Sequence, residues 1–233
     1  MLAVDNVTVV FDEVRAVDQT SLEVGDGERL AVLGPSGSGK STLLRAIGGL
    51  ERLESGSVRW DGADLQGVPP HRRRFGFMFQ GYALFPHMTV GENVSFGLRM
   101  EDRPPDKIAA RVAEVLEWVG MIDFAPRSVE NLSGGEQQRV ALARTLAPNP
   151  RMVMLDEPLG ALDRTLRERL IVEMTELLDR AGTTALYVTH DHAEAATFAD
   201  RIALMRQGRI VQLGTMEELR RSPADDWVKE FLD

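Results

Sequence analysis

The chain has 233 residues, of which 43% are hydrophobic and 27% are charged, and its formal net charge is −9 at pH 7. This length fits one large domain or two small ones with the composition of an ordinary globular protein. The acidic balance argues against a general nucleic-acid binder, because affinity for a phosphate backbone needs a basic surface. The absence of cysteine excludes disulfides and thiolate sites. The sequence shows no apolar run long enough to span a bilayer and no secretory signal, so we expect a cytoplasmic protein.

The first segments are rich in β-forming residues. Residues 2–10 and 20–24 have partly alternating polarity, so we expect them to be strands of an antiparallel sheet. Phe11 lies between them at a turn. The local pattern leaves two interpretations open for this ring, an aromatic of the core or edge and a stacking platform for a base.

A phosphate-binding loop follows an apolar strand at 30–33 and precedes a helix that begins near residue 42. Glycines allow backbone N–H groups to approach a phosphate, and the helix N-terminus adds its positive dipole end. Lys40 would supply a point charge to the outer phosphates, and the Ser41 hydroxyl would ligate Mg²⁺. The predicted nucleotide-binding loop consists of Gly34, Pro35, Ser36, Gly37, Ser38, Gly39, Lys40, Ser41 and Thr42.

The next segments alternate between apolar strands and polar connections. Residues 56–62 are expected to form a strand that runs into a turn, and the three arginines at 72–74 are expected to be solvated or paired with local acids. Residues 75–79 form a short apolar strand ending at Gln80, a position where α/β sheets place ligand contacts. The apolar segment 82–90 is either buried or a docking surface.

The middle of the chain, from about 86 to 149, is predicted to be helical. Pro104 to Gly120 carries apolar residues at helical spacing. At the next helix start, Ser133 and Glu136 form a capping box. The adjacent glycines there, Gly134 and Gly135, could also free backbone N–H groups for a second anion.

Two further strands end in polar side chains. The apolar run 152–155 leads into Asp156 and Glu157, and buried adjacent carboxylates without a cation would be costly. Beside a phosphate loop that cation would be Mg²⁺, held by Asp156 through water, while Glu157 could polarise an attacking water. The strand 184–189 ends at His190, and a metal pair of His190 with His192 is disfavoured because no third ligand has zinc-like spacing. A hairpin at 201–212, a helix at 216–221 and a short tail complete the chain.

Taken together and in this order, the phosphate loop, Gln80, the Leu-Ser-Gly-Gly-Glu segment at 132–136, Asp156-Glu157 and His190 resemble an ATP-binding-cassette (ABC) ATPase. The segments at 85–90 and 157–163 are more closely similar to the ATPase subunits of bacterial importers for polyamines, ferric iron, sulfate, thiamine and sugars. The resemblance covers nearly the whole chain. It implies an α/β fold, with a RecA-like phosphate-loop core, an antiparallel β subdomain and an inserted helical subdomain.

The resemblance also implies a role for each matching residue. Two subunits would face each other head to tail, with Ser133, Gly134 and Gly135 of one gripping the γ-phosphate bound by the other. Phe11 would stack on adenine, where the family more often has Tyr. Gln80 would ligate Mg²⁺ together with Ser41 and Asp156, and it would sense the γ-phosphate. The implied catalytic residues are Glu157 as general base, His190 on the γ-phosphate, Gln80 and Lys40; Asp163 would cross the dimer interface. Glu136 stands where many members have Gln.

The implied function is ATP hydrolysis that drives a membrane importer from the cytoplasmic face of the inner membrane. The implied partners are a second copy or a related ATPase subunit, permease subunits that dock near Tyr82–Val90 and, indirectly, a solute-binding protein, with no nucleic acid. An exporter or lipid-extraction ATPase and a soluble ABC ATPase outside transport remain as alternatives. DNA-repair members of the family carry a long coiled coil, and translation factors carry two cassettes, neither of which this sequence shows.

The expected subdivision is an ATPase core with its β subdomain at 1–86 and 149–215, a helical subdomain at 87–148, and a C-terminal helix and tail at 216–233. Many relatives with the importer pattern continue into a β-rich regulatory domain. We expect no such domain in this chain.

Overall fold

The computed structural model describes residues 1–160 and 162–233. Ala161, which belongs to the importer-like segment 157–163, lies outside the described residues.

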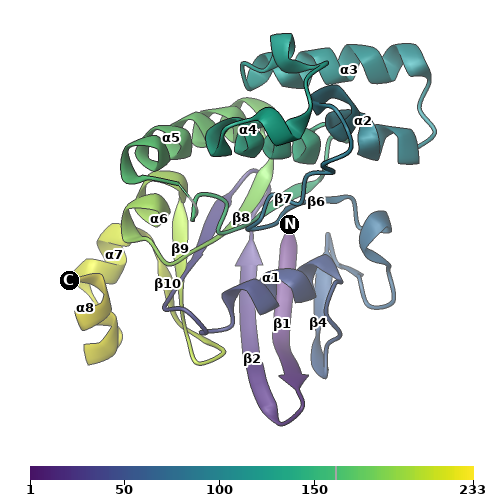
Figure 1. The fold of residues 1–233 in the computed structure, drawn as a ribbon. Coiled ribbons are helices and arrows are strands. Elements are labelled where there is room, and N and C mark those ends of the chain that lie inside the picture. Colours follow the sequence, from purple (N-terminus) through teal and green to yellow (C-terminus); the bar gives the residue numbers. More distant parts are fainter. Residues whose placement is uncertain (161) are drawn as a thin grey trace.

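Two β-sheets form the framework (Figure 1). The smaller sheet has the order β2-β1-β4-β5 and consists of β1 (Leu2–Phe11), β2 (Val14–Val24), β4 (Ser55–Trp60) and β5 (Ala63–Asp64), all paired antiparallel. The larger sheet has the order β10-β9-β3-β8-β7-β6 and consists of β3 (Arg29–Leu33), β6 (Phe75–Met78), β7 (Met152–Asp156), β8 (Thr184–Thr189), β9 (Arg201–Arg206) and β10 (Arg209–Gly214). Its strands are parallel except for the predicted β9–β10 hairpin. The predicted α/β fold with an antiparallel β subdomain is confirmed.

Strand β1 changes its buried face partway along. Leu2 and Val4 are buried, but beyond Asn6 the buried valines are Val7 and Val9. The register with β2 shifts between Val4 and Val7, and Asn6 has a positive φ of 46°. Such a bulge flips the inward side of a strand, which explains why the polarity of this segment alternates only in part.

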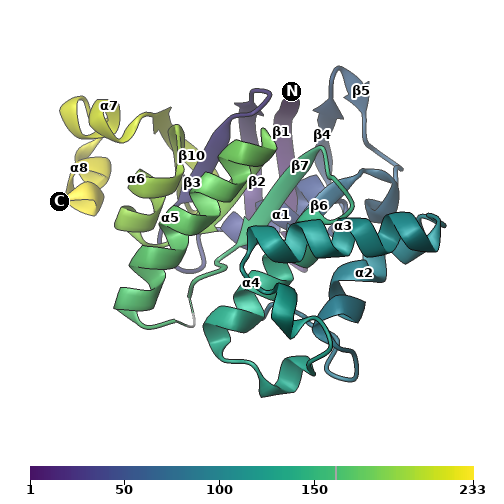
Figure 2. The ribbon, with the colours of Figure 1, turned by 90° about the horizontal axis from the view of Figure 1, so that it is seen from above.

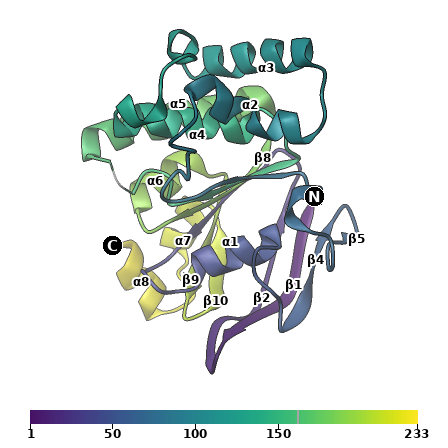
Figure 3. The ribbon, with the colours of Figure 1, turned by 45° about the vertical axis from the view of Figure 1, so that its right-hand side comes forward.

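Apolar cores lie on both faces of the larger sheet. Helix α1 (Lys40–Gly48) buries Leu43, Leu44 and Ile47 in one core, against the antiparallel sheet and one face of the larger sheet. The other core is formed with α2 (Val90–Met100), α3 (Pro105–Trp118), α4 (Gly134–Leu146) and α5 (Arg164–Ala181). Figures 1 and 3 show these four helices together, on the side of the sheet away from α1. Because both faces are covered, β7 and β8 are buried along their whole length.

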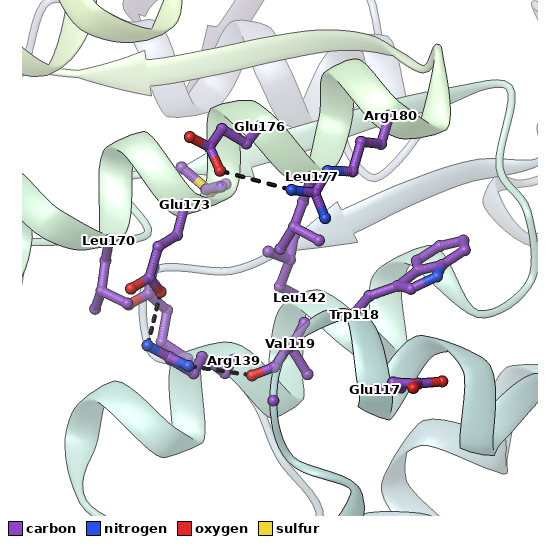
Figure 4. Close-up of a pocket in the computed structure, with 13 residues that line it drawn as sticks. Glu117, Trp118, Val119, Arg139, Leu142, Leu170, Glu173, Glu176, Leu177 and Arg180 are labelled. Atoms are coloured by element: carbon purple, nitrogen blue, oxygen red, sulfur yellow. Dashed lines mark hydrogen bonds and ion pairs between the residues drawn. The ribbon is translucent and has the colours of Figure 1, made fainter.

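The regular elements between β6 and β7 are helices, as expected from the sequence. They are α2, α3, α4 and the short 3-10 helices η2 (Ile122–Phe124) and η3 (Val129–Asn131). Val115 and Leu116 of α3 are fully buried, as its apolar spacing predicted. Arg139 of α4 pairs with Glu173 of α5 at 2.7 Å and donates to the Val119 carbonyl oxygen at 3.2 Å. Figure 4 shows these bonds beside a cavity of about 300 Å³, so one arginine braces α4 against both α3 and α5.

The C-terminal segment contains more structure than we expected. After α6 (His192–Phe198) and α7 (Met216–Arg221), the predicted tail forms a further helix, α8 (Asp226–Leu232), which Figure 2 shows beside α7. The Asp225 carboxylate accepts a bond from the Val228 N–H at 2.8 Å and so caps this helix. Val228 and Leu232 pack in an apolar cluster with Ile202 of β9, which fixes the helix to the sheet.

The arginines at 72–74 do not all behave as expected. Next to the 3-10 helix η1 (Pro70–Arg72), Arg73 is buried, and it is neither solvated nor paired with an acid through hydrogen bonds. Its guanidinium donates to three carbonyl oxygens, those of Ile47, Leu65 and Val68, at 2.7–2.9 Å. The expectation was wrong for Arg73 because these acceptors are backbone groups brought together only by the fold.

Replacing Arg73 with Met should destabilise the protein by about 2–4 kcal/mol, because carbonyl groups at the end of α1 and in the 65–68 loop would lose charged donors. The methionine keeps the apolar stem, so packing changes least. Urea denaturation measures the difference, and Arg72→Ala, at an exposed neighbouring position, serves as the control. Equal stability of the two variants would contradict this assignment.

Candidate functional site

The phosphate-binding loop connects β3 to α1, as the sequence predicts. Lys40 lies in the first turn of α1 and is buried, with its Nζ donating to the carbonyl oxygens of Gly34 and Pro35 at 2.9 Å each. Burial lowers the pKa of Lys40, and the nearby carboxylates of Glu157 and Asp156 oppose that shift. Because the N-cap residue of α1 is Gly39, the helix has no capping side chain of its own. Its first N–H groups therefore suit an anionic ligand.

Two glycines of the loop are required by packing as well as by any ligand. A Cβ at Gly34 would lie 2.2 Å from the Met205 carbonyl oxygen, and one at Gly39 would lie 2.1 Å from that of Ala16. Gly39 also has a φ of 101°, in the left-handed region that favours glycine. The loop is therefore held between β9 and the β1–β2 hairpin.

The Gly34→Ala variant should lose about 2 kcal/mol or more of unfolding free energy, because its methyl group would collide with backbone that cannot move aside cheaply. Gly81→Ala is the matched control, since a Cβ there meets nothing within 4 Å. Urea denaturation of both variants compares the two sites. A Gly34 variant as stable as the control would show that the loop is not clamped in this way.

Ser41 and Asp156 meet at the start of α1. The Ser41 hydroxyl donates to the Asp156 carboxylate at 2.5 Å, and Arg45 lies 3.6 Å from the other carboxylate oxygen. Burial raises the pKa of Asp156, while the Ser41 bond and Arg45 oppose the rise. Hydroxyl and carboxylate oxygens side by side are the ligands that Mg²⁺ prefers, so these two residues fit the predicted metal site.

Gln80, Glu157 and His190 come together as well. The Glu157 carboxylate lies 3.2 Å from Nδ1 of His190 and 3.5 Å from Nε2 of Gln80. Each residue follows one of three adjacent strands, β6, β7 and β8. Glu157 has a φ of 44°, a strained conformation for a residue with a side chain. Such strain persists where the surrounding structure fixes it, and it is concentrated at functional sites.

The two histidines that could be misread as a metal pair have different neighbours. His190 contacts Glu157, whereas the ring of His192 packs edge-on against Phe231 of α8, 4.7 Å between centroids.

Phe11 ends β1, and its side chain is 45% exposed. It pairs with Val14 across the hairpin, two residues before Ala16, whose carbonyl oxygen adjoins Gly39 of the phosphate loop. The ring is therefore an exposed aromatic near the loop rather than part of a core, and a role in stacking on adenine stays a prediction.

The segment Ser133–Glu136 begins α4. The Glu136 carboxylate accepts bonds from both the N–H and the hydroxyl of Ser133, at 2.8 and 2.7 Å, and these bonds lower the pKa of Glu136. The capped-helix interpretation is thus correct. Binding of an anion by Ser133, Gly134 and Gly135 stays a prediction, and α4 lies on the opposite face of the larger sheet from α1.

Asp163 is the N-cap of α5, where its carboxylate accepts a bond from the Leu166 N–H at 3.0 Å. Beside it lies a largely buried polar network that the sequence did not predict, formed by Arg167, Tyr187, Thr189 and Glu194. Two features of the sequence could have indicated this network: Tyr187 is the one tyrosine in a mostly apolar strand, and Arg167 lies one helical turn after Asp163.

The sequence model of the ABC transporter family matches residues 17–160 of this chain. The chain belongs to the ABC transporter family. It is an ATP-binding-cassette ATPase, as the order of its motifs predicted.

Curated relatives support the more specific resemblance. The chain is 55% identical to the Fe(3+) ions import ATP-binding protein FbpC of Streptomyces coelicolor over 100% of this chain and 67% of that protein. It is 49% identical to the putrescine transport ATP-binding protein PotG of Escherichia coli, over 100% of this chain and 62% of that protein. The chain thus spans about two thirds of the length of these relatives. The predicted similarity to importer subunits is confirmed.

Solved structures support the fold. The ATP-binding cassette MJ0796, solved as a dimer in a post-hydrolysis state bound to ADP and Pi, has a TM-score of 0.82 and 34% sequence identity. The match covers 92% of this chain and 98% of that one.

Proposed function

We propose that this chain hydrolyses ATP to energise a membrane importer and that it acts as a head-to-tail pair of subunits. The observation that carries the proposal is the separation of the candidate site residues by the larger sheet, with α1 packed on one face of that sheet and α4 on the other. The phosphate loop, Gln80, Glu157 and His190 follow neighbouring strands of one sheet, whereas Ser133–Gly135 belong to a helix on the far face from α1. A second subunit would bring its own Ser133–Gly135 to the nucleotide.

The residues at the strand ends have complementary roles in this proposal. Lys40 and the N–H groups that start α1 bind the phosphates, and Phe11 stacks on the base. Ser41 and Asp156, with Gln80, would hold Mg²⁺, which supplies charge neutralisation at the phosphates. Glu157 is the general base that takes a proton from the attacking water, and His190 holds the Glu157 carboxylate and contacts the γ-phosphate.

The segment Tyr82–Val90 is proposed as the contact with permease subunits. Tyr82 and Val90 are buried, while Ala83, Pro86 and His87 are exposed, so the segment is partly anchored and partly available. Arg144 of α4 anchors it by donating to the carbonyl oxygens of Tyr82 and Ala83 at 2.6 Å each. Since Gln80 lies only two residues before Tyr82, movement of a permease bound to this segment would be transmitted to the nucleotide through a short stretch of chain.

No helix in the part of the chain that the structure describes is long and apolar enough to cross a membrane. Because the chain is similar to import ATP-binding proteins, we propose peripheral attachment to the cytoplasmic face through the permease. Two relatives of similar identity to this chain are named for different solutes, Fe(3+) and putrescine. We therefore propose that the permease and a solute-binding protein select the transported solute, and not this chain.

Glu157→Gln should lower the rate of ATP hydrolysis at least about 100-fold, because the amide cannot accept the water proton. ATP-dependent dimerisation should survive, since phosphate binding does not require that proton transfer. Turnover is measured by phosphate release and dimerisation by light scattering. Glu217→Gln, an exposed change in α7, is the control. Normal hydrolysis by the Glu157 variant would reject the general-base assignment, and failure of ATP to dimerise it would reject the shared site.

Phe11→Ala should weaken ATP binding about 5- to 150-fold, because a stacked ring is worth about 1–3 kcal/mol. The rate at saturating ATP should change much less, since the ring is proposed to touch the base and not the phosphates. Titration with a fluorescent ATP analogue gives the affinity. Val14→Ala, at the paired and more exposed position, is the control. Unchanged affinity would show that Phe11 is an edge aromatic only.

A further inference from the structure

Arg167 occupies a position between two loops of the site. It lies in the first turn of α5, and its Nη2 donates to the Leu162 carbonyl oxygen at 3.0 Å. Its Nη1 lies 3.4 Å from the Asp191 carboxylate, and its Nε lies 3.5 Å from that of Glu194. One planar guanidinium therefore connects the loop after β7 to the loop after β8, a geometry that suits arginine and not lysine.

The loop after β8 is fixed by a buried network around Glu194, which is only 5% exposed. Glu194 accepts bonds from the hydroxyl groups of Tyr187 and Thr189 at 2.7 and 2.6 Å. The Thr189 oxygen in turn accepts the Asp191 N–H at 3.0 Å. The Asp191 carboxylate caps α6 by accepting the N–H groups of Ala193 and Glu194. Both neighbours of His190 in the chain thus belong to the network that Arg167 contacts.

The His190 side chain itself does not bond to this network. Its side chain is half exposed and contacts the Glu157 carboxylate at 3.2 Å. The position of its ring therefore depends strongly on the backbone from Thr189 to Asp191. That backbone is connected through Arg167 to the Leu162 carbonyl, one residue before Asp163.

We propose that Arg167 is a positioning residue that couples the Leu162–Asp163 segment to His190 within one subunit. The inference rests on the proposed function, in which Asp163 lies at the contact with the second subunit. When that subunit displaces or fixes Asp163, the Leu162 carbonyl carries the change through Arg167 to Asp191 and so to the His190 backbone. His190 and Glu157 then reach their reactive arrangement only when the partner is seated.

Three variants of the full chain test the coupling. Arg167→Met removes all three contacts and should lower kcat at least about tenfold while KM for ATP stays within about threefold, since coupling between sites is typically 5–150-fold. Arg167→Lys keeps a cation beside Glu194 but cannot reach all three acceptors, so kcat should stay lowered at least about fivefold with a near-normal thermal midpoint. Arg164→Met, an exposed change in the same helical turn, should leave kcat within about twofold of the wild type.

A double-mutant cycle distinguishes positioning from mere structural support. If Arg167 acts through His190, Arg167→Met should change the single-turnover rate less than about twofold in a His190→Ala background. A full tenfold loss in that background, or wild-type kcat in both Arg167 variants, would overturn the inference. Hydrolysis by the wild type and the Arg164 control in the same assay supports the proposed function whichever result Arg167 gives, whereas its absence from both would reject that function instead.

Discussion

The alignment of parallel strand ends is the constraint on which the rest of the site depends. Strands β6, β7 and β8 pair in a fixed register, with Met78 beside Leu155 and Leu155 beside Tyr187. Gln80, Glu157 and His190 follow those pairs and so reach the same edge of the sheet, next to the loop after β3. A shift of one residue in any strand would point its side chains to the opposite face. The burial of β7 and β8 prevents such a shift, so the apolar core determines the geometry of the candidate site.

Each charged side chain at this edge has a polar partner within the chain, and the arrangement favours a particular kind of ligand. Lys40 is satisfied by two loop carbonyls, Asp156 by Ser41 and Arg45, and Glu157 by His190. A bare polyphosphate would meet Lys40 but would also be repelled by the carboxylates of Glu157 and Asp156, and Arg45 is already paired with Asp156. A polyphosphate that carries a divalent cation would meet an ammonium group for its oxygens and carboxylates for its metal. The side chains thus fit a metal–nucleotide complex better than either component alone.

Where the signal is local, the sequence predicted the elements and the positions of the candidate site residues at the strand ends. The apolar run before each polar strand end identified β3, β6, β7 and β8, and the spacing of the phosphate loop identified its Lys40 and Ser41. It failed where a residue's partner is distant in the chain. Arg73 has local polarity typical of a surface loop, yet its acceptors include Ile47, 26 residues away. Arg167 reaches Asp191, 24 residues away, in the same manner. The bulge at Asn6 was visible only as imperfect alternation.

The two interpretations of Ser133–Glu136 describe one physical property. The start of α4 attracts negative charge through its N–H groups and dipole, and in the single chain the Glu136 carboxylate satisfies that attraction. Under the proposed function, the γ-phosphate of the partner's ATP would compete with this carboxylate for the Ser133 hydroxyl. A glutamate is ionised at neutral pH, and the Ser133 bonds lower the pKa of Glu136 further. Its carboxylate therefore adds repulsion that an amide at this position would not add. In the proposed pair, the other contacts to the phosphates must therefore supply enough binding free energy to offset the repulsion from the Glu136 carboxylate, which already occupies the start of α4.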